Sequence, residues 1–193
     1  MLILASASPR RRELLRSLTA EFTVMPSEVQ ELLAPGPLAE AVARLALDKA
    51  RAVAARVREG IVLGADTVVC LGGEPLGKPS GPDEARAMLR RLRGREHEVI
   101  TGVAVVDART GRAERTAVTS RVRMGEYGDG AIDAYVATGE PLDKAGAYAI
   151  QGAGSALVAG WEGSYSNVVG LPLAETARLL AAFGVAVSAP PAR

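Results

Sequence analysis

Three consecutive arginines, Arg10, Arg11 and Arg12, directly follow Ser8 and Pro9 near the start of the chain. Serine suits the N-cap of a helix and proline its first position, so the arginines fall in the first helical turn. That end of a helix carries partial positive charge, which disfavours cations. A bound polyanion would reverse the penalty, because backbone N–H groups and guanidinium groups would converge on the same phosphates. This pattern predicts an anion site; a solvated basic turn is the alternative.

A carboxylate, Asp66, interrupts the apolar run "IVLGADTVVCL". An unpaired carboxylate is costly to bury, so Asp66 needs a cation, a metal or a position that faces a cleft. An ionised aspartate is an oxygen ligand for Mg²⁺ and can also take a proton from an attacking water. The preceding Gly64 and the hydroxyl of Thr67 favour a site here. An aspartate that caps a turn or pairs with an arginine is the alternative.

Lysine is rare in this chain: of 23 basic residues, 20 are arginine, and the lysines are Lys49, Lys78 and Lys144. Because lysine is a compact point charge, this usage indicates that an ammonium is needed at these positions, for example on a phosphate; chance is an equal alternative. Lys78 lies in "GGEPLGKP", which begins like a phosphate-binding P-loop. Pro79 replaces the required Ser or Thr and has no N–H, which excludes that loop. Lys78 still lies on a stiff turn from which it could reach a phosphate.

The stretch "GEPLDKAGAYAIQG" changes from charged to small residues and nearly ends with Gln151. An amide presents one acceptor and two donors, which suits the edge of a nucleobase. A hydrogen bond from Gln151 to nearby backbone is an equally good interpretation. The chain has one cysteine and one histidine, which excludes a metal centre built from several such residues. We expect His97 to be a strand-edge or core residue, not a catalyst.

The composition is that of an ordinary soluble globular protein, with 48% hydrophobic and 23% charged residues. The net charge of +1 provides no field that would attract nucleic acid or a membrane surface. No segment approaches the ~18 consecutive apolar residues of a membrane span, and no leader peptide is apparent. A single cysteine, Cys70, fits a reducing compartment. We therefore expect a cytoplasmic protein without nucleic-acid or membrane partners.

The apolar pattern predicts an α/β protein with a mixed β-sheet and flanking helices. Strands are expected at residues 2–5, 22–25, 61–71, 98–107 and 113–124, and helices at 9–18, 38–57, 82–92, 132–136 and 173–183. A hairpin across residues 109–111 interrupts the alternation, which favours a sheet in two lobes over a purely parallel one. Residues 139–160 read as loop with one or two strands. We expect a single domain over residues 1–187 and a frayed tail at 188–193.

Several of these blocks, in chain order, resemble the Maf family of nucleoside triphosphate pyrophosphatases. The blocks are "LASASPRRRELL", Glu31 after "SEVQ", Lys49 in "LALDKA", "GADTVV", "GKP", "TGVAVV", "GEPLDKAGAYAIQG" and "NVVGLPL". They run from Leu2 to about Leu180. The resemblance implies a mixed α/β sheet similar to that of the inosine triphosphatase group, with a cleft between two lobes. In "AGWEGSYSNVVG", Trp161-Glu162 departs from the family's usual short aliphatic lead-in, which concerns packing near the cleft.

The resemblance also implies roles for individual residues. Asp66 would accept the proton of the attacking water, and Glu31 would lie near a divalent metal, Mg²⁺ or Mn²⁺. The implied substrate-binding residues are Lys49 and Lys78 on the triphosphate, Ser6 and Arg11 at the phosphate turn, and Arg10, Thr67 and Gln151 for substrate choice. The form "DKAGAYAIQG" is similar to the branch that hydrolyses dTTP and UTP. A homodimer is suggested by the resemblance alone.

The expected activity is hydrolysis of dTTP, UTP and modified pyrimidine triphosphates to the monophosphate and pyrophosphate. Its role would be to clean the nucleotide pool. A non-catalytic, nucleotide-binding regulator of cell division or septum formation is the alternative. It would share the anion site, and the carboxylates of Glu31 and Asp66 favour the enzyme over it.

Overall fold

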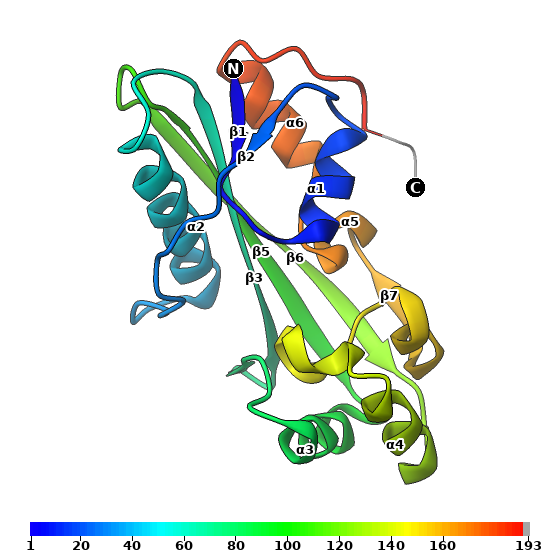
Figure 1. The fold of residues 1–193 in the computed structure, drawn as a ribbon. Coiled ribbons are helices and arrows are strands. Elements are labelled where there is room, and N and C mark those ends of the chain that lie inside the picture. The colour runs from blue at the N-terminus through cyan, green and yellow to red at the C-terminus, as the bar shows by residue number, and fades with distance from the viewer. Residues whose placement is uncertain (191–193) are drawn as a thin grey trace. The chain divides into compact units, whose positions relative to one another are not determined.

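The structure is a computed structural model that describes residues 1–190, and its central element is a seven-stranded sheet (Figure 1). The strands are β1 (Leu2–Leu4), β2 (Thr23–Val24), β3 (Ile61–Leu71), β4 (Glu74–Leu76), β5 (Glu96–Asp107), β6 (Ala113–Met124) and β7 (Val158–Glu162). The order across the sheet is β2-β1-β3-β5-β6-β7, and β4 pairs with β3. Strand β1 runs parallel to β2 and β3, whereas β4 is antiparallel to β3 and β7 to β6. The predicted mixed sheet with flanking helices is confirmed.

Six α-helices and three short 3₁₀ helices complete the described chain. The α-helices are α1 (Pro9–Arg16), α2 (Leu38–Ala54), α3 (Pro82–Leu92), α4 (Asp129–Ala137), α5 (Tyr165–Val169) and α6 (Leu173–Ala182). The 3₁₀ helices are η1 (Glu140–Asp143), η2 (Ala145–Ala147) and η3 (Gly152–Leu157). Nowhere in residues 1–190 is a helix both long enough and apolar enough to cross a membrane.

The chain divides into two compact units. Unit 1 holds Met1–Asp66, Thr101–Val118 and the described residues from Gly170 onward, and unit 2 holds Thr67–Ile100 and Thr119–Val169. Strands β3, β5 and β6 contribute residues to both units. The assignment of residues 1–187 to a single domain stays a prediction.

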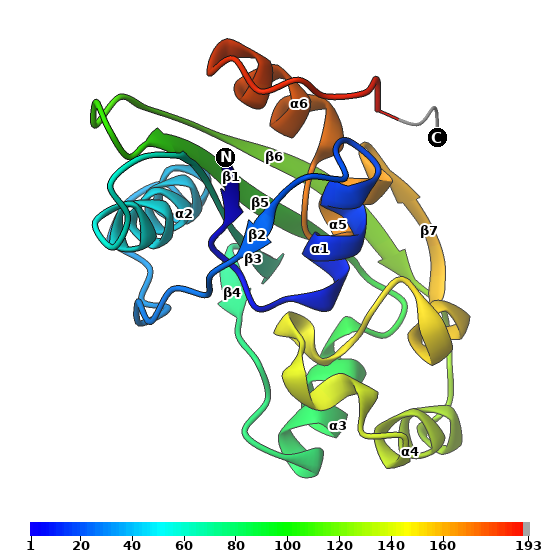
Figure 2. The ribbon, with the colours of Figure 1, turned by 45° about the horizontal axis from the view of Figure 1, so that its top comes forward.

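In unit 1, successive residues of the buried strands face different helices. Leu2 and Leu4 of β1 pack in one cluster with Leu15 of α1 and Leu180 of α6, whereas Ile3 packs in a second cluster with residues of α2. Figure 2 shows α2 on one side of these strands and α1 and α6 on the other. Because side chains alternate along a strand, a strand covered on both faces must be apolar throughout. This explains why the expected strands 2–5 and 61–71 have no polar-apolar alternation.

Unit 2 has its own core, in which α3 and α4 pack on the strands. Leu89 of α3 and Ile132 of α4 are fully buried there, together with Val122 of β6. Tyr148, from the "DKAGAYAIQG" stretch, belongs to the same cluster. This stretch is therefore anchored in the core of unit 2 rather than lying loose on the surface.

Most predicted element boundaries are confirmed, and those of β3, β6 and α3 match to the residue. Two short elements, β4 and α5, were not expected from the sequence. Strand β4 forms because Gly72 and Gly73 both adopt positive φ, +59° and +87°, which turns the chain back on β3. Residues 139–160 consist mainly of 3₁₀ turns and end in the first part of one strand, β7.

The end of the described chain still contacts unit 1, because the backbone N–H of Ser188 donates to the carbonyl of Leu18 over 2.8 Å. Residues 191–193 of the predicted frayed tail lie outside the described residues. The tail therefore stays a prediction.

Candidate active site

The basic turn is the N-terminus of α1, as predicted. The side chain of Ser8 accepts a hydrogen bond from the backbone N–H of Arg11 over 3.4 Å, and Pro9 is the first helical residue. The Arg11 side chain turns inward: its Nε donates to the Gly170 carbonyl over 2.9 Å, and its Nη1 to the Ser6 hydroxyl over 3.2 Å. Ser6 and Arg11, both predicted to line the phosphate turn, thus contact each other.

Two carboxylates act electrostatically on Arg11. Burial lowers the pKa of its guanidinium, Asp66 and Glu31 oppose that shift by raising the pKa, and the nearby Arg10 adds to the lowering. Arg10 and Arg12 are half-buried, and within the part of the chain that the structure describes their side chains form no hydrogen bond or ion pair. The first turn of α1 therefore holds one guanidinium fixed near the acidic residues and two that remain available to an anion.

Lys49 joins the two carboxylates that the sequence singled out. Its Nζ lies 2.6 Å from Oδ1 of Asp66 and 2.8 Å from Oε1 of Glu31. The side chains of Lys49 and Asp66 are only 6% and 11% exposed, whereas that of Glu31 is 52% exposed. A buried ion needs a partner of opposite charge, so Lys49 compensates the charge of Asp66. Three segments far apart in the sequence thus meet within unit 1.

The close approach of α2 to β3 places Lys49 beside Asp66. A Cβ atom at Gly64 of β3 would lie 2.3 Å from the carbonyl oxygen of Ala46 and 2.9 Å from the Cβ atom of Ala50, both on α2. At Gly102 of β5, a Cβ atom would lie 2.5 Å from the carbonyl oxygen of Val42. No larger residue fits either position without displacing the helix. Gly64, the glycine of "GADTVV", therefore helps to position Lys49 beside Asp66.

The carboxylates of Glu31 and Asp66 form a sparse ligand set. Within residues 1–190, no group of three or more His, Cys, Asp or Glu side chains could hold a metal ion. Mg²⁺ is commonly bound by one or two carboxylates together with substrate phosphates and waters. Glu31 and Asp66, which both contact Lys49, are too few to enclose an ion by themselves. They are better suited to a magnesium site that substrate phosphates and waters complete.

The remaining predicted site residues belong to unit 2. Thr67 follows Asp66 on β3 and is half-buried, whereas Lys78 and Gln151 are exposed. The carbonyl of Gly77, beside Lys78, accepts a hydrogen bond from the N–H of Gly146 over 3.0 Å. The "GKP" block is thereby tied to the "DKAGAYAIQG" block, and both can be described as one loop region of unit 2.

His97 is a core residue, as expected. It is 2% exposed, and its Nε2 lies 2.7 Å from the hydroxyl of Tyr148. Burial lowers the pKa of His97 to about 4, so the ring is neutral at physiological pH.

Asn167 is a buried polar residue whose role the sequence did not reveal. Its Nδ2 donates to the carbonyl of Val99 over 3.0 Å and to the hydroxyl of Ser120 over 2.9 Å. It thereby links β5 and β6 inside unit 2. In the sequence, the one indication of this role is that Asn167 directly precedes the two apolar valines of "NVVG".

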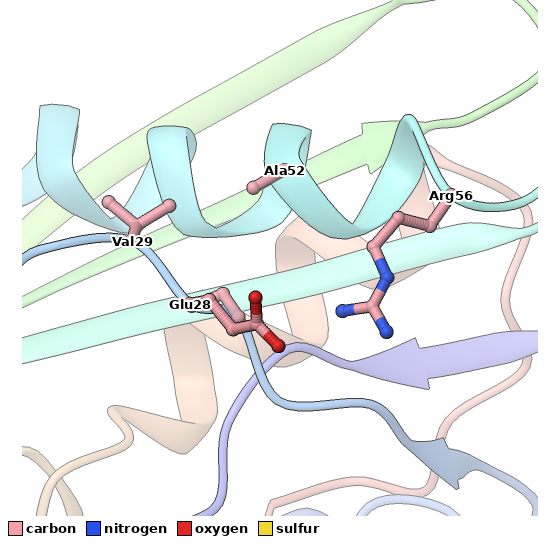
Figure 3. Close-up of a pocket in the computed structure, with 5 residues that line it drawn as sticks. Glu28, Val29, Ala52 and Arg56 are labelled. Carbon is pink, nitrogen blue, oxygen red and sulfur yellow. The ribbon is translucent and has the colours of Figure 1, made fainter.

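A pocket of about 280 Å³ lies beside the loop that leads to Glu31. Figure 3 shows Ala52 on α2, Arg56 just after the end of this helix, and Glu28 and Val29 on the facing loop. An Arg56 nitrogen, Nη1, donates to the carbonyl of Pro26 over 3.3 Å, which ties this loop to the end of α2. None of the predicted site residues lines this pocket.

Comparisons of the sequence with known proteins agree on one family. A family model described as "Maf-like protein" matches residues 1–183. The chain is 56% identical over 187 residues to a dTTP/UTP pyrophosphatase of Moorella thermoacetica, which covers 96% of each chain. It is 55% identical to a dTTP/UTP pyrophosphatase of Myxococcus xanthus, which covers 96% of this chain and 93% of that protein.

A solved structure of the Staphylococcus aureus Ham1 protein matches with a TM-score of 0.44 and 17% identity, covering 66% of this chain and 74% of that one. The family assignment depends on the sequence matches, which span nearly the whole chain, and not on this structural match. They show that the chain belongs to the Maf family.

Proposed function

We infer that this protein hydrolyses dTTP and UTP, and modified pyrimidine triphosphates, to the nucleoside monophosphate and pyrophosphate. The two relatives named above are called dTTP/UTP pyrophosphatases and match over nearly their full length. The observation that carries the proposal is Asp66, a nearly buried carboxylate held 2.6 Å from the ammonium of Lys49. Asp66 lies in unit 1 together with Arg11, and its negative charge raises the pKa of the Arg11 guanidinium.

The proposed chemistry requires a base and positive charge. Water attacks at the α–β anhydride, a new P–O bond forms, the bond to the pyrophosphate oxygen breaks, and Asp66 takes the proton from the water. Negative charge develops on the non-bridging phosphate oxygens, which Arg10, Arg11 and Lys49 are suited to stabilise. Ser6 supports Arg11 through its hydroxyl.

Glu31 would hold a divalent cation, Mg²⁺ or Mn²⁺, together with the phosphates of the substrate. When bound, such an ion polarises phosphoryl oxygens and neutralises part of their charge. The half-exposed position of Glu31 suits a ligand that an incoming cation and nucleotide can reach.

In unit 2, we propose that Lys78 contacts a phosphate, and that Thr67 and Gln151 contribute to substrate choice, as does Arg10 of unit 1. The amide of Gln151 can accept from the N3–H of thymine or uracil and donate to a neighbouring carbonyl of the base. Gln151 is exposed and its side chain has no hydrogen bond within the described residues, so its amide can meet a ligand. A cytoplasmic location and a homodimer belong to the same proposal.

Asp66 and Glu31 favour an enzyme over a non-catalytic regulator. A protein that only binds nucleotide needs the cations but no general base, the role proposed for Asp66. In unit 1, two acidic side chains are tied directly to the lysine proposed to bind phosphate.

Product analysis tests the proposed function. With [α-³²P]dTTP and Mg²⁺ or Mn²⁺, the expected products are labelled dTMP and unlabelled pyrophosphate. Labelled dTDP with release of orthophosphate would contradict the proposed bond cleavage. Tight binding of dTTP without turnover under all metal conditions would favour the regulator. A screen of natural and modified triphosphates with pyrophosphate detection would then identify the preferred base.

A further inference from the structure

Gln151 lies in the middle of a loop, residues 149–154, that changes abruptly from buried to exposed. Ala149, Ile150 and Gly154 are buried, whereas Gln151, Gly152 and Ala153 are exposed. Gly152 adopts a positive φ of +66°, which turns the chain immediately after Gln151. An exposed amide on a short turn can recognise a base only if the backbone beneath it is held in place.

Tyr135 holds the loop before Gln151. This residue of α4 is 4% exposed, and its hydroxyl accepts a hydrogen bond from the backbone N–H of Ala149 over 3.1 Å. The same hydroxyl lies 3.0 Å from Oε1 of Glu140, to which it donates. The Tyr135 hydroxyl therefore links the loop to the Glu140 carboxylate, because it accepts a hydrogen bond from the loop and donates one to Glu140.

Glu140 holds the loop after Gln151. Its Oε2 accepts from the backbone N–H of Ala153 over 3.2 Å, and its Oε1 accepts from that of Gly154 over 3.4 Å. The carbonyl of Glu140 accepts from Nζ of Lys144 over 2.6 Å, which also fixes its backbone. Hydrogen bonds to a carboxylate are stronger than those between neutral groups.

The fit between the loop and these side chains leaves no spare volume. A Cβ atom at Gly154 would lie 2.4 Å from the carbonyl oxygen of Ala149 and 2.6 Å from the hydroxyl oxygen of Tyr135. A Cβ atom at Gly152 would lie 2.9 Å from Oε2 of Glu140. Tyr135 and Glu140, which bond to each other, therefore fix the loop before and after Gln151.

We propose that Tyr135 and Glu140, together the Tyr135–Glu140 clamp, are positioning residues that fix the amide of Gln151 for base recognition. This inference rests on the proposed function and deepens it by adding residues that determine specificity without touching the substrate. The ring of Tyr135 packs in the core of unit 2, as a phenylalanine could. Its hydroxyl, in contrast, bonds to Ala149 of the loop and to Glu140.

The test compares Tyr135→Phe with wild-type protein. The variant removes one oxygen atom and keeps the ring. We expect the KM for dTTP to rise about tenfold with a smaller change in kcat, since the hydrogen bonds lost serve positioning and not chemistry. The preference for dTTP over the purine triphosphates, taken as a ratio of kcat/KM values, should fall by a similar factor. Glu140→Gln, which keeps one of the two acceptor oxygens, should lie between wild type and Tyr135→Phe.

A double-mutant cycle separates positioning from general stability. If the clamp acts through Gln151, adding Tyr135→Phe to Gln151→Ala should cause no further loss of selectivity. The matched control is Tyr127→Phe, which also removes a phenol hydroxyl in unit 2, one that donates to the Leu89 carbonyl over 2.8 Å. Its selectivity should equal that of wild type. Thermal unfolding of each variant shows whether it is folded, and Glu140→Gln carries the test should Tyr135→Phe not fold.

The two proposals fail in distinguishable ways. If wild-type protein hydrolyses dTTP and UTP but Tyr135→Phe and Glu140→Gln keep wild-type KM and selectivity, the clamp is overturned and the activity stands. Full additivity of Tyr135→Phe and Gln151→Ala in selectivity would overturn it as well. If wild-type protein hydrolyses neither nucleotide, the proposed function falls and this inference falls with it.

Discussion

The two units position their predicted site residues by different means. In unit 1, Asp66 and Lys49 lie on a buried strand and a long helix whose spacing is set by backbone packed against backbone at Gly64. In unit 2, Gln151 lies on a six-residue segment, 149–154, whose backbone N–H groups donate to Tyr135 and Glu140. Regular elements hold the charged groups proposed for bond cleavage, and a tethered loop holds the group proposed for base recognition.

This difference has consequences for what each region tolerates. A charged centre fixed by helix–strand packing changes only when the packing or the charges change, and such changes affect chemistry and stability together. A loop fixed by a few hydrogen bonds can shift at a smaller energetic cost, which alters recognition and leaves the core intact. The predictions below test this contrast, beginning with the largest expected effect.

Asp66→Asn should abolish most of the activity. It keeps the size of the side chain and removes the base, so kcat for dTTP should fall by about 10²- to 10⁴-fold while nucleotide affinity is retained. Pyrophosphate release and calorimetric binding of dTTP measure the two quantities. Asp48→Asn, an exposed neighbour of Lys49 on α2, is the matched control and should behave as wild type. Normal turnover by Asp66→Asn would show that another group is the base.

Lys49→Arg should reduce activity although it keeps the positive charge. A planar guanidinium does not fit where a single ammonium, 6% exposed, contacts two carboxylates. We expect kcat/KM to fall about tenfold, equivalent to ~1.4 kcal/mol of transition-state stabilisation. Arg51→Lys, the opposite exchange at an exposed position of the same helix, should leave kcat/KM unchanged. Full activity of Lys49→Arg would mean that only the charge at this position matters.

Gly64→Ala should weaken unit 1 by forcing α2 away from β3. The added Cβ atom would meet backbone atoms that cannot rotate away, so the free energy of unfolding should fall by about 1–3 kcal/mol. Urea denaturation measures the change, and activity should fall with it because Lys49 moves with α2. The control is Gly130→Ala in α4, where a Cβ atom meets nothing within 4 Å. That variant should gain about 0.5–1 kcal/mol, since alanine favours a helix. Equal effects at both glycines would refute the packing argument.

The stability of unit 2 should depend on pH through His97. Its pKa is about 4 in the folded protein against 6.5 in the unfolded chain, so the unfolded state binds more protons between these values. Stability is therefore complete above pH 6.5 and falls as the pH drops, by about 1 kcal/mol between pH 7 and 5.5.

Urea denaturation at pH 7 and 5.5 measures this loss. His97 is the only histidine of the chain, so few other groups titrate in this window. His97→Phe should flatten the dependence. An unchanged slope in that variant would assign the effect to other groups.

The sequence predicted regular elements well because their signals are local. The predicted bounds of strand β3 and helix α3 match the structure to the residue. Strand β3 is an apolar run that Gly72 ends. Helix α3 is an amphipathic segment that begins at a proline and is followed by Gly94. The short elements β4 and α5 span three and five residues, too few for a periodic pattern to emerge.

The sequence pointed to individual candidate residues, whose roles stay predictions, but not to their arrangement. The family resemblance pointed to Lys49 and Asp66, yet their 2.6 Å contact depends on how closely α2 packs on β3. The hydrogen bonds of Tyr135 and Glu140 to the loop have no sequence signal at all, because a side chain that bonds to a backbone N–H follows no periodicity.

The alanine face of α2 also has a cost in core volume. Ala46 and Ala50 stand where leucines would bury far more apolar surface, worth about 0.8 kcal/mol for each CH₂ group. The small alanines thus reduce the hydrophobic stabilisation between α2 and β3. They also let the helix pack closely enough for the ammonium of Lys49 to contact Asp66. Redesigns that enlarge these alanines to raise thermal stability would therefore disturb the contact of Lys49 with Asp66, which we propose serves catalysis.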